Sequence, residues 1–336
     1  MKYVFFGTPK FSSIILEKLI AIGYIPEAVI CNPDKPLGRK QVFTSPPVKF
    51  VAEKFKIKVI QPQKLRGNSE FLEQFKKLKP ELAIIVAYGK IITKEVLDIP
   101  ARGFINVHPS LLPKYRGASP IQYAILNGDQ ETGITIMEVD EEMDHGKIIL
   151  NLKVKISNLD TYESLSHKLA ESAGELLVKI IPDYISGKIK PVEQEHEKAT
   201  LTKIIKKEDG RIDWSKSADE IERMIRAYYP WPTAWTQVNL PPTPRLRRAG
   251  KSPARNATHS VTGGKISNLK IIEADVLEIN NNDNFGEVFL TQNNKLAIKC
   301  GKNALIIKKL QLEGRKILSA KEFLNGHQNF IGNILE

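Results

Sequence analysis

Residues 2–31, KYVFFGTPKFSSIILEKLIAIGYIPEAVIC, decide the fold that we expect for this chain. A short apolar run ends at Gly7, a helical pattern follows from Ser12 to Ile22, and a second apolar run occupies 27–31. A strand, a helix and a second strand in this order form the unit that joins neighbouring parallel strands. The opening stretch therefore predicts an α/β domain.

The same alternation continues for about another eighty residues. A second helix is expected over Ser69 to Leu78. The further strand-like runs are VAEKF at 51–55, KVIQP at 58–62, LAIIVAY at 82–88 and GFINVH at 103–108. Repeated strand and helix signals favour a Rossmann-like, mostly parallel sheet.

The pattern changes in the second half of the chain. Helices are expected near 161–187, where Asp160 or Thr161 would serve as a cap, and from Ser217 to Ala227. Short strand-like runs punctuated by Gly, Asn and Asp follow: TQVNL, LKIIEADVL, GEVFLT, KLAIKC and ALIIKKL. Such runs are typical of a small β-barrel such as an OB-fold. We expect a catalytic domain over 1–205 and an OB-like domain over 206–336.

Composition narrows the class of protein. With 336 residues, 42% hydrophobic and 26% charged, the chain has the composition and the length of two globular domains. The first residues lack the apolar stretch of a signal peptide, and no apolar run reaches the ~18 residues of a membrane span, so a soluble cytoplasmic protein is expected. We also expect a monomer. Cys31 and Cys300 stand far apart without a C-x-x-C partner, so we expect buried thiols and no metal site. The net charge of +12 suits a polyanionic partner, although a lysine-rich composition alone also produces such a charge.

One segment fits neither domain. Residues 241–264, PPTPRLRRAGKSPARNATHSVTGG, contain five Arg or Lys, no acidic residue and hardly any apolar periodicity. This composition predicts a flexible basic insertion within the second domain, and a solubilising loop is the simplest interpretation.

Three common nucleotide and hydrolase motifs are absent. FFGTPKF has one glycine where the dinucleotide-binding fingerprint needs three, and Pro9 removes a backbone donor at the start of the helix. No G-x-x-x-x-G-K-[ST] sequence occurs, which argues against nucleoside triphosphate hydrolysis. The stretch around Gly117 to Ser119 lacks the second glycine of a nucleophile elbow.

Polar residues near the ends of two expected strands suggest a site. In GFINVH, Asn106 and His108 are two apart, so a strand directs both side chains to one face. The stretch TGITIMEVDEEMDHG contains a strand, Ile134 to Val139, and then an acidic loop with Asp144 before Gly146. Ligands bind at the carboxyl ends of strands in open α/β sheets. An amide, an imidazole and a carboxylate there can perform acyl transfer, although each residue taken alone is commonly structural.

The quoted residues carry a resemblance to a known family. NVHPSLLPKYRGASPIQ, residues 106–122, closely resembles the signature of the 10-formyltetrahydrofolate-dependent transformylases. The members that formylate methionyl-tRNA are similar over GTPKF, VAYGKII, ETGITIMEVDEEMDHG and IRAYYPWPTAW, in order along nearly the whole chain. Two departures are Pro109, where many relatives have Gly, and the length of the 241–264 segment.

The resemblance implies an activity and a set of site residues. The reaction would be transfer of the formyl group of 10-formyltetrahydrofolate to the α-amino group of initiator methionyl-tRNA, with the second domain helping to hold the tRNA and with no metal. The implied catalytic residues are Asn106, His108 and Asp144. The implied folate-binding residues are Ser110, Leu111, Leu112 and Pro113, with the loop residues Ala87, Tyr88 and Gly89. The implied tRNA contacts are Arg39, Lys40 and Lys35, in the basic loop CNPDKPLGRKQVFTSPPVK at 31–49.

Three alternatives stay open at this point. An N-formyltransferase that acts on an amino sugar nucleotide would share the first domain and the three catalytic residues. A formyltetrahydrofolate hydrolase would use water as the acceptor. A non-catalytic RNA-binding protein would use only the β-barrel and the basic charge.

Overall fold

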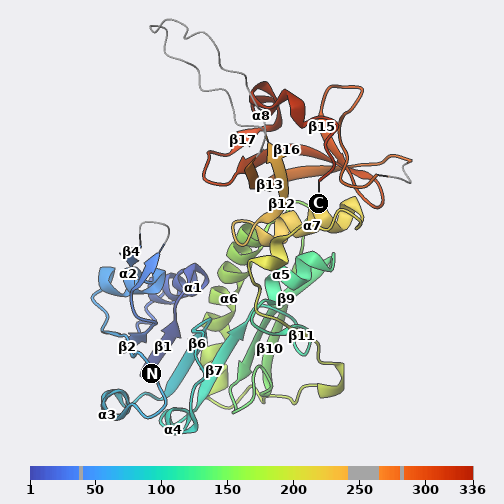
Figure 1. Ribbon diagram of the computed structural model, residues 1–336. Helices are drawn as coiled ribbons and strands as arrows, with labels where there is room; N and C mark the ends of the chain where they lie inside the picture. The colour runs from blue at the N-terminus through green and yellow to red at the C-terminus, as the bar shows by residue number, and fades with distance from the viewer. Residues whose placement is uncertain (38–40, 241–264, 281–283, 336) are drawn as a thin grey trace, which may run out of the picture. The chain divides into compact units, whose positions relative to one another are not determined.

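The structure is a computed structural model that describes residues 1–37, 41–240, 265–280 and 284–335. The chain divides into two compact units, Met1–Ile204 and Ile205–Glu336 (Figure 1). Arg39, Lys40 and the 241–264 segment lie outside the described residues.

The first unit is built on a seven-stranded sheet in the order β10-β9-β7-β6-β1-β2-β5. The β7–β6, β6–β1, β1–β2 and β2–β5 pairs are parallel, whereas β9 runs antiparallel to both β7 and β10. The prediction of a mostly parallel sheet is therefore confirmed. The strands are β1 (Tyr3–Gly7), β2 (Ala28–Ile30), β5 (Val59–Ile60), β6 (Leu82–Val86), β7 (Phe104–His108), β9 (Glu131–Glu138) and β10 (Ile148–Lys155).

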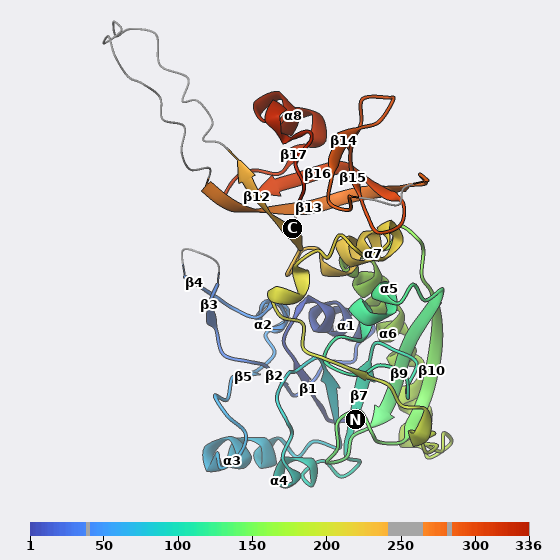
Figure 2. The same ribbon diagram turned by 45° about the vertical axis from the view of Figure 1, so that its right-hand side comes forward.

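Helices cover both faces of this sheet, as the views in Figures 1 and 2 show. On one face, Val4 and Phe6 of β1 pack with Phe71 and Phe75 of α3 (Ser69–Leu78), and α4 (Lys94–Leu97) joins the same cluster. On the other face, a Cβ atom on Gly7 would meet the side chain of Ser12 in α1 at 2.7 Å. The α1 helix (Lys10–Ala21) packs against α6 (Tyr162–Ile185). Because side chains alternate along β1, the strand packs against helices on both faces of the sheet.

One predicted element of the first unit is wrong. Residues 51–55, expected to be extended, belong to α2 (Pro47–Lys54) and its C-cap residue Phe55. Pro47 stands at the first helical position, where its missing N–H costs nothing. The buried residues Val48, Val51 and Ala52 then follow the helical spacing of three and four.

The predicted start of the long helix is confirmed. Thr161 is the N-cap of α6, and it exchanges hydrogen bonds with Ser164 in a capping box. Asp160, the other candidate cap, instead accepts from the backbone N–H of Ser157 and forms an ion pair with Lys168 at 2.7 Å. The remaining elements of this unit are β3 (Lys35–Leu37), β4 (Val42–Thr44), β8 (Arg116–Gly117), α5 (Pro120–Leu126), the short helix η1 (His196–Lys198) and β11 (Leu201–Thr202).

The second unit is an antiparallel sheet with helices. The sheet has the order β12-β13-β16-β15-β14, with β17 paired to β16, and every described pair is antiparallel. All five predicted strand-like runs lie in or overlap strands. The elements are η2 (Glu208–Gly210), α7 (Ala218–Tyr228), β12 (Ala234–Leu240), β13 (Lys265–Leu277), β14 (Val288–Leu290), β15 (Leu296–Lys299), β16 (Ala304–Leu312), β17 (Leu318–Ser319), α8 (Ala320–Gly326) and η3 (Gln328–Phe330).

The core of the second unit joins the sheet to α7. The N-cap Ser217 forms a capping box with Glu220, and Ile221 and Ile225 one turn apart enter a cluster with residues of β13, β15 and β16. Cys300 is buried in this cluster, and Cys31 is buried in the first unit, as expected for isolated thiols. None of the helices in the described ranges is long and apolar enough to cross a membrane.

Candidate active site

Asn106 and His108 both lie in β7 (Phe104–His108), and His108 is its last residue, at the carboxyl end of the strand. Asn106 is partly exposed, whereas His108 is 4% exposed. The ring atom Nε2 of His108 lies 2.9 Å from the carbonyl oxygen of Tyr115. A carbonyl oxygen only accepts, so Nε2 carries a proton in this arrangement, and the orientation of the ring is fixed.

The loop between β9 and β10 brings Asp144 to the same place. Its Oδ1 atom lies 3.3 Å from Asn106 Nδ2, which donates to it, and 3.5 Å from His108 Nδ1. Its Oδ2 atom accepts from the backbone N–H of Gly117 at 2.8 Å. The structure therefore brings the three predicted side chains together around one carboxylate, on a site that is only partly open to solvent.

The backbone of Asp144 is in an unusual conformation. Its φ is +53°, in the left-handed region that non-glycine residues seldom adopt and that the surroundings must stabilise. Two residues on, a Cβ atom on Gly146 would come within 2.2 Å of the carbonyl oxygen of Glu138. The close approach leaves no room for a side chain at residue 146, and in this loop the Asp144 carboxylate meets Asn106 and His108 of β7.

The segment after His108 is held by buried polar contacts. Ser110 is fully buried, and its hydroxyl donates to the carbonyl oxygen of Lys114 at 2.5 Å. Thr135 in β9 donates to the carbonyl oxygen of Ser110 and accepts from the N–H of Leu112. The Leu112–Pro113 peptide bond is cis. Leu111 lies against Gly133 of β9, where a Cβ atom would meet Leu111 Cδ2 at 2.4 Å. Among the predicted folate-binding residues, Ser110 and Leu112 are therefore interior, and Leu111 and Pro113 are partly exposed.

The loop after β6 exposes two small residues on either side of a buried tyrosine. Tyr88 is 1% exposed, whereas its neighbours Ala87 and Gly89 are exposed and have φ values of +46° and +78°. The carbonyl oxygen of Tyr88 accepts from Asn32 Nδ2 at 3.0 Å. Lys90 fixes the far end of the loop, because its Nζ donates to the carbonyl oxygens of Pro62 and Gln63.

Part of the basic loop at 31–49 folds as a hairpin of β3 and β4. Asp34 holds its base: the carboxylate accepts from Gln61 Nε2, from Lys49 Nζ and from Ser45 Oγ. These three donors lower the pKa of Asp34 to about 2, Gln61 first, because they stabilise the charged form. Lys35 begins the hairpin and is exposed, as is Phe43 on the opposite strand.

Sequence reasoning missed Gln194. This residue is 4% exposed, and its Nε2 donates to the carbonyl oxygens of Asp144 and Gly146 at 3.0 and 2.7 Å. Arg116, which is 8% exposed, donates to Gln194 Oε1 from Nε and Nη2. No pattern in VEQEHEKATLT distinguishes this glutamine from a solvated one, because its partners are at least 48 residues away.

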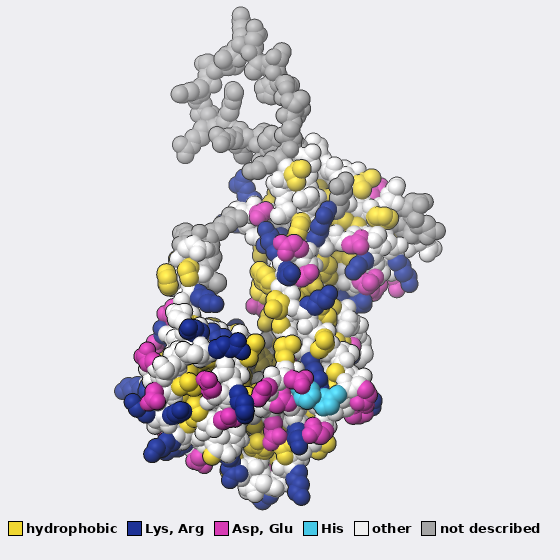
Figure 3. Space-filling model, turned by 60° about the horizontal axis from the view of Figure 1, so that its bottom comes forward, with side chains coloured by type: hydrophobic (Ala, Val, Ile, Leu, Met, Phe, Trp, Pro, Cys, Tyr) yellow, Lys and Arg dark blue, Asp and Glu magenta, His cyan; other side chains and the backbone are white. Residues whose placement is uncertain are grey.

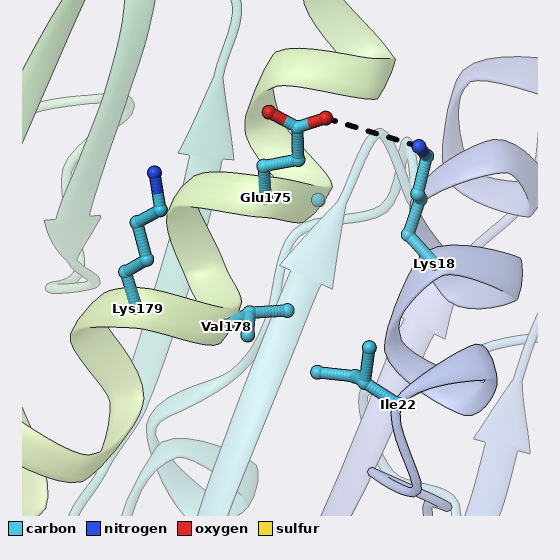
Figure 4. A pocket seen from close by; sticks show the side chains of 6 residues that line it. Lys18, Ile22, Glu175, Val178 and Lys179 are labelled. Carbon is cyan, nitrogen blue, oxygen red and sulfur yellow. Dashed lines mark ion pairs between the residues drawn. The ribbon is translucent and has the colours of Figure 1, made fainter.

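A surface groove of the first unit lies apart from this site. Figure 4 shows a groove between α1 and α6 lined by Lys18, Ile22, Gly174, Glu175, Val178 and Lys179, with an ion pair of 3.9 Å between Lys18 and Glu175. It contains none of the residues discussed above. Within the described ranges, no three His, Cys, Asp or Glu side chains are grouped so that they could hold a metal ion.

Comparison with known proteins defines the class. Residues 1–181 match the family described as Formyl transferase, and residues 204–328 match Formyl transferase, C-terminal domain. Among solved structures, HypX from Aquifex aeolicus in complex with tetrahydrofolic acid has a TM-score of 0.59 at 16% identity, over 96% of this chain and 47% of that chain. The N-formyltransferase from Helicobacter canadensis, in complex with folinic acid and dTDP-3-aminofucose, has a TM-score of 0.60 at 20% identity, over 91% of this chain and 99% of that chain. The fold is that of the formyl transferases.

Curated relatives narrow the class further. A protein from Caldicellulosiruptor saccharolyticus named methionyl-tRNA formyltransferase is 40% identical over 338 residues, and the alignment covers 100% of both chains. One of the same name from Caldanaerobacter subterraneus subsp. tengcongensis is also 40% identical, over 336 residues and 100% of both chains. The chain belongs to the methionyl-tRNA formyltransferase family.

Proposed function

We propose that this protein transfers the formyl group of 10-formyltetrahydrofolate to the α-amino group of initiator methionyl-tRNA, the step that prepares the tRNA for translation initiation in the cytoplasm. The observation that carries the proposal is the convergence of Asn106 Nδ2 and His108 Nδ1 on Asp144 Oδ1, at 3.3 and 3.5 Å. Family membership supports the same acceptor and the same one-carbon chemistry.

The reaction needs little activation of the nucleophile. The α-amino group of an esterified amino acid has a pKa at or below about 8, so a substantial neutral fraction is present at pH 7. The amine attacks the formyl carbon, the bond from that carbon to the donor nitrogen breaks, and the donor nitrogen takes up the proton that the amine loses. The chain must therefore stabilise a developing oxyanion and move one proton.

Each of the three residues has a role in that step. Asn106 Nδ2 carries two N–H groups, so one can donate to Asp144 while the second donates to the oxyanion. His108 has its Nε2 proton held by the Tyr115 carbonyl, which leaves Nδ1 as the ring atom that faces Asp144. Asp144 orients this imidazole across 3.5 Å and relays the proton from the amine.

The formyl donor would be held by backbone and by apolar side chains. The exposed backbone of Ala87 and Gly89 offers N–H and C=O groups for the edge of the pterin ring. The partly exposed Leu111 and Pro113 follow directly on the segment that begins at His108. The donor would thus lie between two loops whose conformations are fixed by buried and partly buried hydrogen bonds of Ser110, Thr135 and Asn32.

The tRNA would be bound by the basic loop at 31–49 and by the second unit, which we propose to be an OB-like domain. Support comes from its antiparallel sheet and from the net charge of +12 of the whole chain. On the face drawn in Figure 3, Lys and Arg side chains are interspersed with Asp and Glu. Charge alone therefore marks no single binding patch on that face, and directed contacts must supply the specificity.

Substitution in the basic loop tests this assignment. Arg39→Ala will lower kcat/KM for methionyl-tRNA by about tenfold or more, because a planar guanidinium makes directed contacts to phosphates and bases that a lysine does not. Lys35→Ala will lower it by only about twofold to threefold, through lost electrostatic attraction. Lys40→Ala is the neighbouring control for loss of charge next to Arg39. Equal effects of Arg39→Ala and Lys35→Ala would contradict the special role of Arg39.

A competition assay distinguishes the acceptors. The protein is incubated with 10-formyltetrahydrofolate and an equimolar mixture of initiator methionyl-tRNA, elongator methionyl-tRNA and dTDP-3-aminofucose. We expect formylmethionine after deacylation of the initiator tRNA. Formylation of the sugar nucleotide alone would favour an N-formyltransferase that acts on amino sugar nucleotides. Release of formate without any formylated acceptor would favour a formyltetrahydrofolate hydrolase.

A further inference from the structure

Gln194 is buried between Arg116 and the β9–β10 loop that contains Asp144. All the donors and acceptors of its side-chain amide are used. Its amide nitrogen has two N–H groups, and these donate to the carbonyl oxygens of Asp144 and Gly146. Its amide oxygen accepts twice from Arg116, at 3.2 Å from Nε and at 2.6 Å from Nη2. Because Arg116 only donates and the two carbonyls only accept, the orientation of the amide is unambiguous.

Arg116 and Gly117 together fix the backbone and the side chain of Asp144. Arg116 holds Gln194, which holds the backbone carbonyl of Asp144. The next residue, Gly117, donates its own N–H to the carboxylate of Asp144 at 2.8 Å. Consecutive residues of one short strand therefore fix the backbone and the side chain of a residue whose φ of +53° is unfavourable on its own.

The short strand itself is attached to the segment that contains Gln194. The β8 strand pairs with β11, the N–H of Arg116 donates to the carbonyl oxygen of Thr200, and the carbonyl oxygen of Arg116 accepts from Thr202 Oγ1. Near the other end of the segment, Val192 exchanges two backbone hydrogen bonds with Ile148 at the start of β10. Gln194 thus lies in a segment fixed on both sides.

A series of side-chain contacts leads from Arg116 through two histidines to Asp140. Its Nη2 atom lies 2.8 Å from His196 Nδ1, the ring of His196 stacks on that of His145 at 4.1 Å, and His145 Nδ1 lies 2.7 Å from Asp140 Oδ2. His145 directly follows Asp144 in the chain. The contacts described for the Arg116 side chain are thus to the neutral amide of Gln194 and to His196.

From this geometry we infer that Gln194 is a positioning residue for the transfer reaction: its amide, oriented by Arg116, holds the Asp144 backbone so that the carboxylate meets Asn106 and His108. It acts through Asp144 and does not contact either substrate. The inference rests on the proposed function, because the position of Asp144 affects activity only if Asp144 takes part in formyl transfer.

The amide chemistry supplies a sharp test. Gln194→Glu has nearly the same shape and can accept from Arg116 in an ion pair, so the fold is retained. A carboxylate cannot donate, however, and it would place oxygen against the carbonyl oxygens of Asp144 and Gly146. Gln194→Met keeps the size and removes all four hydrogen bonds, so its comparison with Gln194→Glu separates loss of donation to Asp144 and Gly146 from loss of the acceptor of Arg116. Gln130→Glu makes the same change in charge at an exposed glutamine and is the matched control.

We expect Gln194→Glu to lower kcat by about ten- to a hundredfold, the range that a supporting contact or a displacement of about 1 Å commonly costs. The KM values for both substrates should change little, and Gln130→Glu should match the wild type. The melting temperature of Gln194→Glu should fall, because the carbonyl oxygens of Asp144 and Gly146 lose their donor, so kcat is compared at a temperature where the variant is folded. Gln194→Met should lower both kcat and the melting temperature. A crystal structure of Gln194→Glu should show Asp144 Oδ1 displaced from Asn106 Nδ2.

Three results would overturn the inference without touching the proposed function. Two of them are a Gln194→Glu enzyme with kcat within twofold of the wild type and an unchanged Asp144 position in its crystal structure. A loss of activity that appears only as a raised KM would also overturn it. Failure of the wild-type protein to formylate methionyl-tRNA would instead overturn the proposed function, and the displacement of Asp144 would then still report on the positioning contact.

Discussion

Asp144→Asn will reduce the single-turnover rate of formyl transfer by about a hundredfold to a thousandfold, the scale of one lost electrostatic contact in a preorganised site. The substitution keeps the size of the side chain and removes its charge. In the native protein, Oδ1 faces Asn106 Nδ2 and His108 Nδ1, and Oδ2 accepts from Gly117 N–H. An amide has only one oxygen to accept these contacts, so its NH₂ group must oppose at least one donor.

The measurement for this variant is a rapid-quench single turnover with the donor and methionyl-tRNA in excess over their KM values. Circular dichroism and the melting temperature check that the variant is folded. Asp98→Asn is the matched control, because Asp98 is exposed and forms an ordinary surface ion pair with Lys94. Retention of half the wild-type rate or more by Asp144→Asn would reduce Asp144 to a structural turn residue.

Asn106→Ala will lower kcat by a similar factor, about a hundredfold or more, because it removes the donor proposed for the developing oxyanion. Its cost in stability will be small, since Asn106 is partly exposed.

His108→Ala will also lower kcat by about a hundredfold or more. In that variant the buried Tyr115 carbonyl loses its donor, which costs about 1–3 kcal/mol of stability.

Combining Asn106→Ala with His108→Ala tests whether the two side chains act as one unit. Residues that act as one unit give strongly non-additive effects, so the Asn106→Ala, His108→Ala double variant should be only slightly slower than the slower single variant. The rates are compared by single-turnover kinetics at a temperature where all three variants remain folded. Multiplicative effects would indicate that the two side chains act independently, which contradicts their action as one unit around Asp144.

Part of this site was predictable from sequence because it depends on local periodicity. Alternation along a strand placed Asn106 and His108 on one face, and the D-H-G sequence marked the tight loop that contains Asp144. The failures concern tertiary contacts. Residues 51–55 taken alone have as many apolar residues as a short strand, and the helical spacing appears only when Val48 is included. Packing of α2 against α1 and β2 then buries that face of the helix.

Gln194 and Arg116 illustrate the same limit. Both look like surface residues in sequence, since Gln and Arg are seldom fully buried unless they are paired. Each is buried because the other satisfies it, across a separation of 78 residues. A spacing rule cannot detect such a pair, and neither could it detect that Ser110, predicted to bind folate, directs its hydroxyl to the carbonyl oxygen of Lys114.

The most direct test of the account follows a labelled formyl group. Wild-type protein and Asp144→Asn are each mixed with 10-formyltetrahydrofolate that carries ¹⁴C in the formyl group and with initiator methionyl-tRNA, and the tRNA is deacylated and analysed for labelled formylmethionine. The account predicts rapid, stoichiometric labelling of the methionine α-amino group by the wild type and a rate at least about a hundredfold lower with the folded variant. Absence of labelled formylmethionine with the wild type, or equal rates for the two proteins, would contradict it.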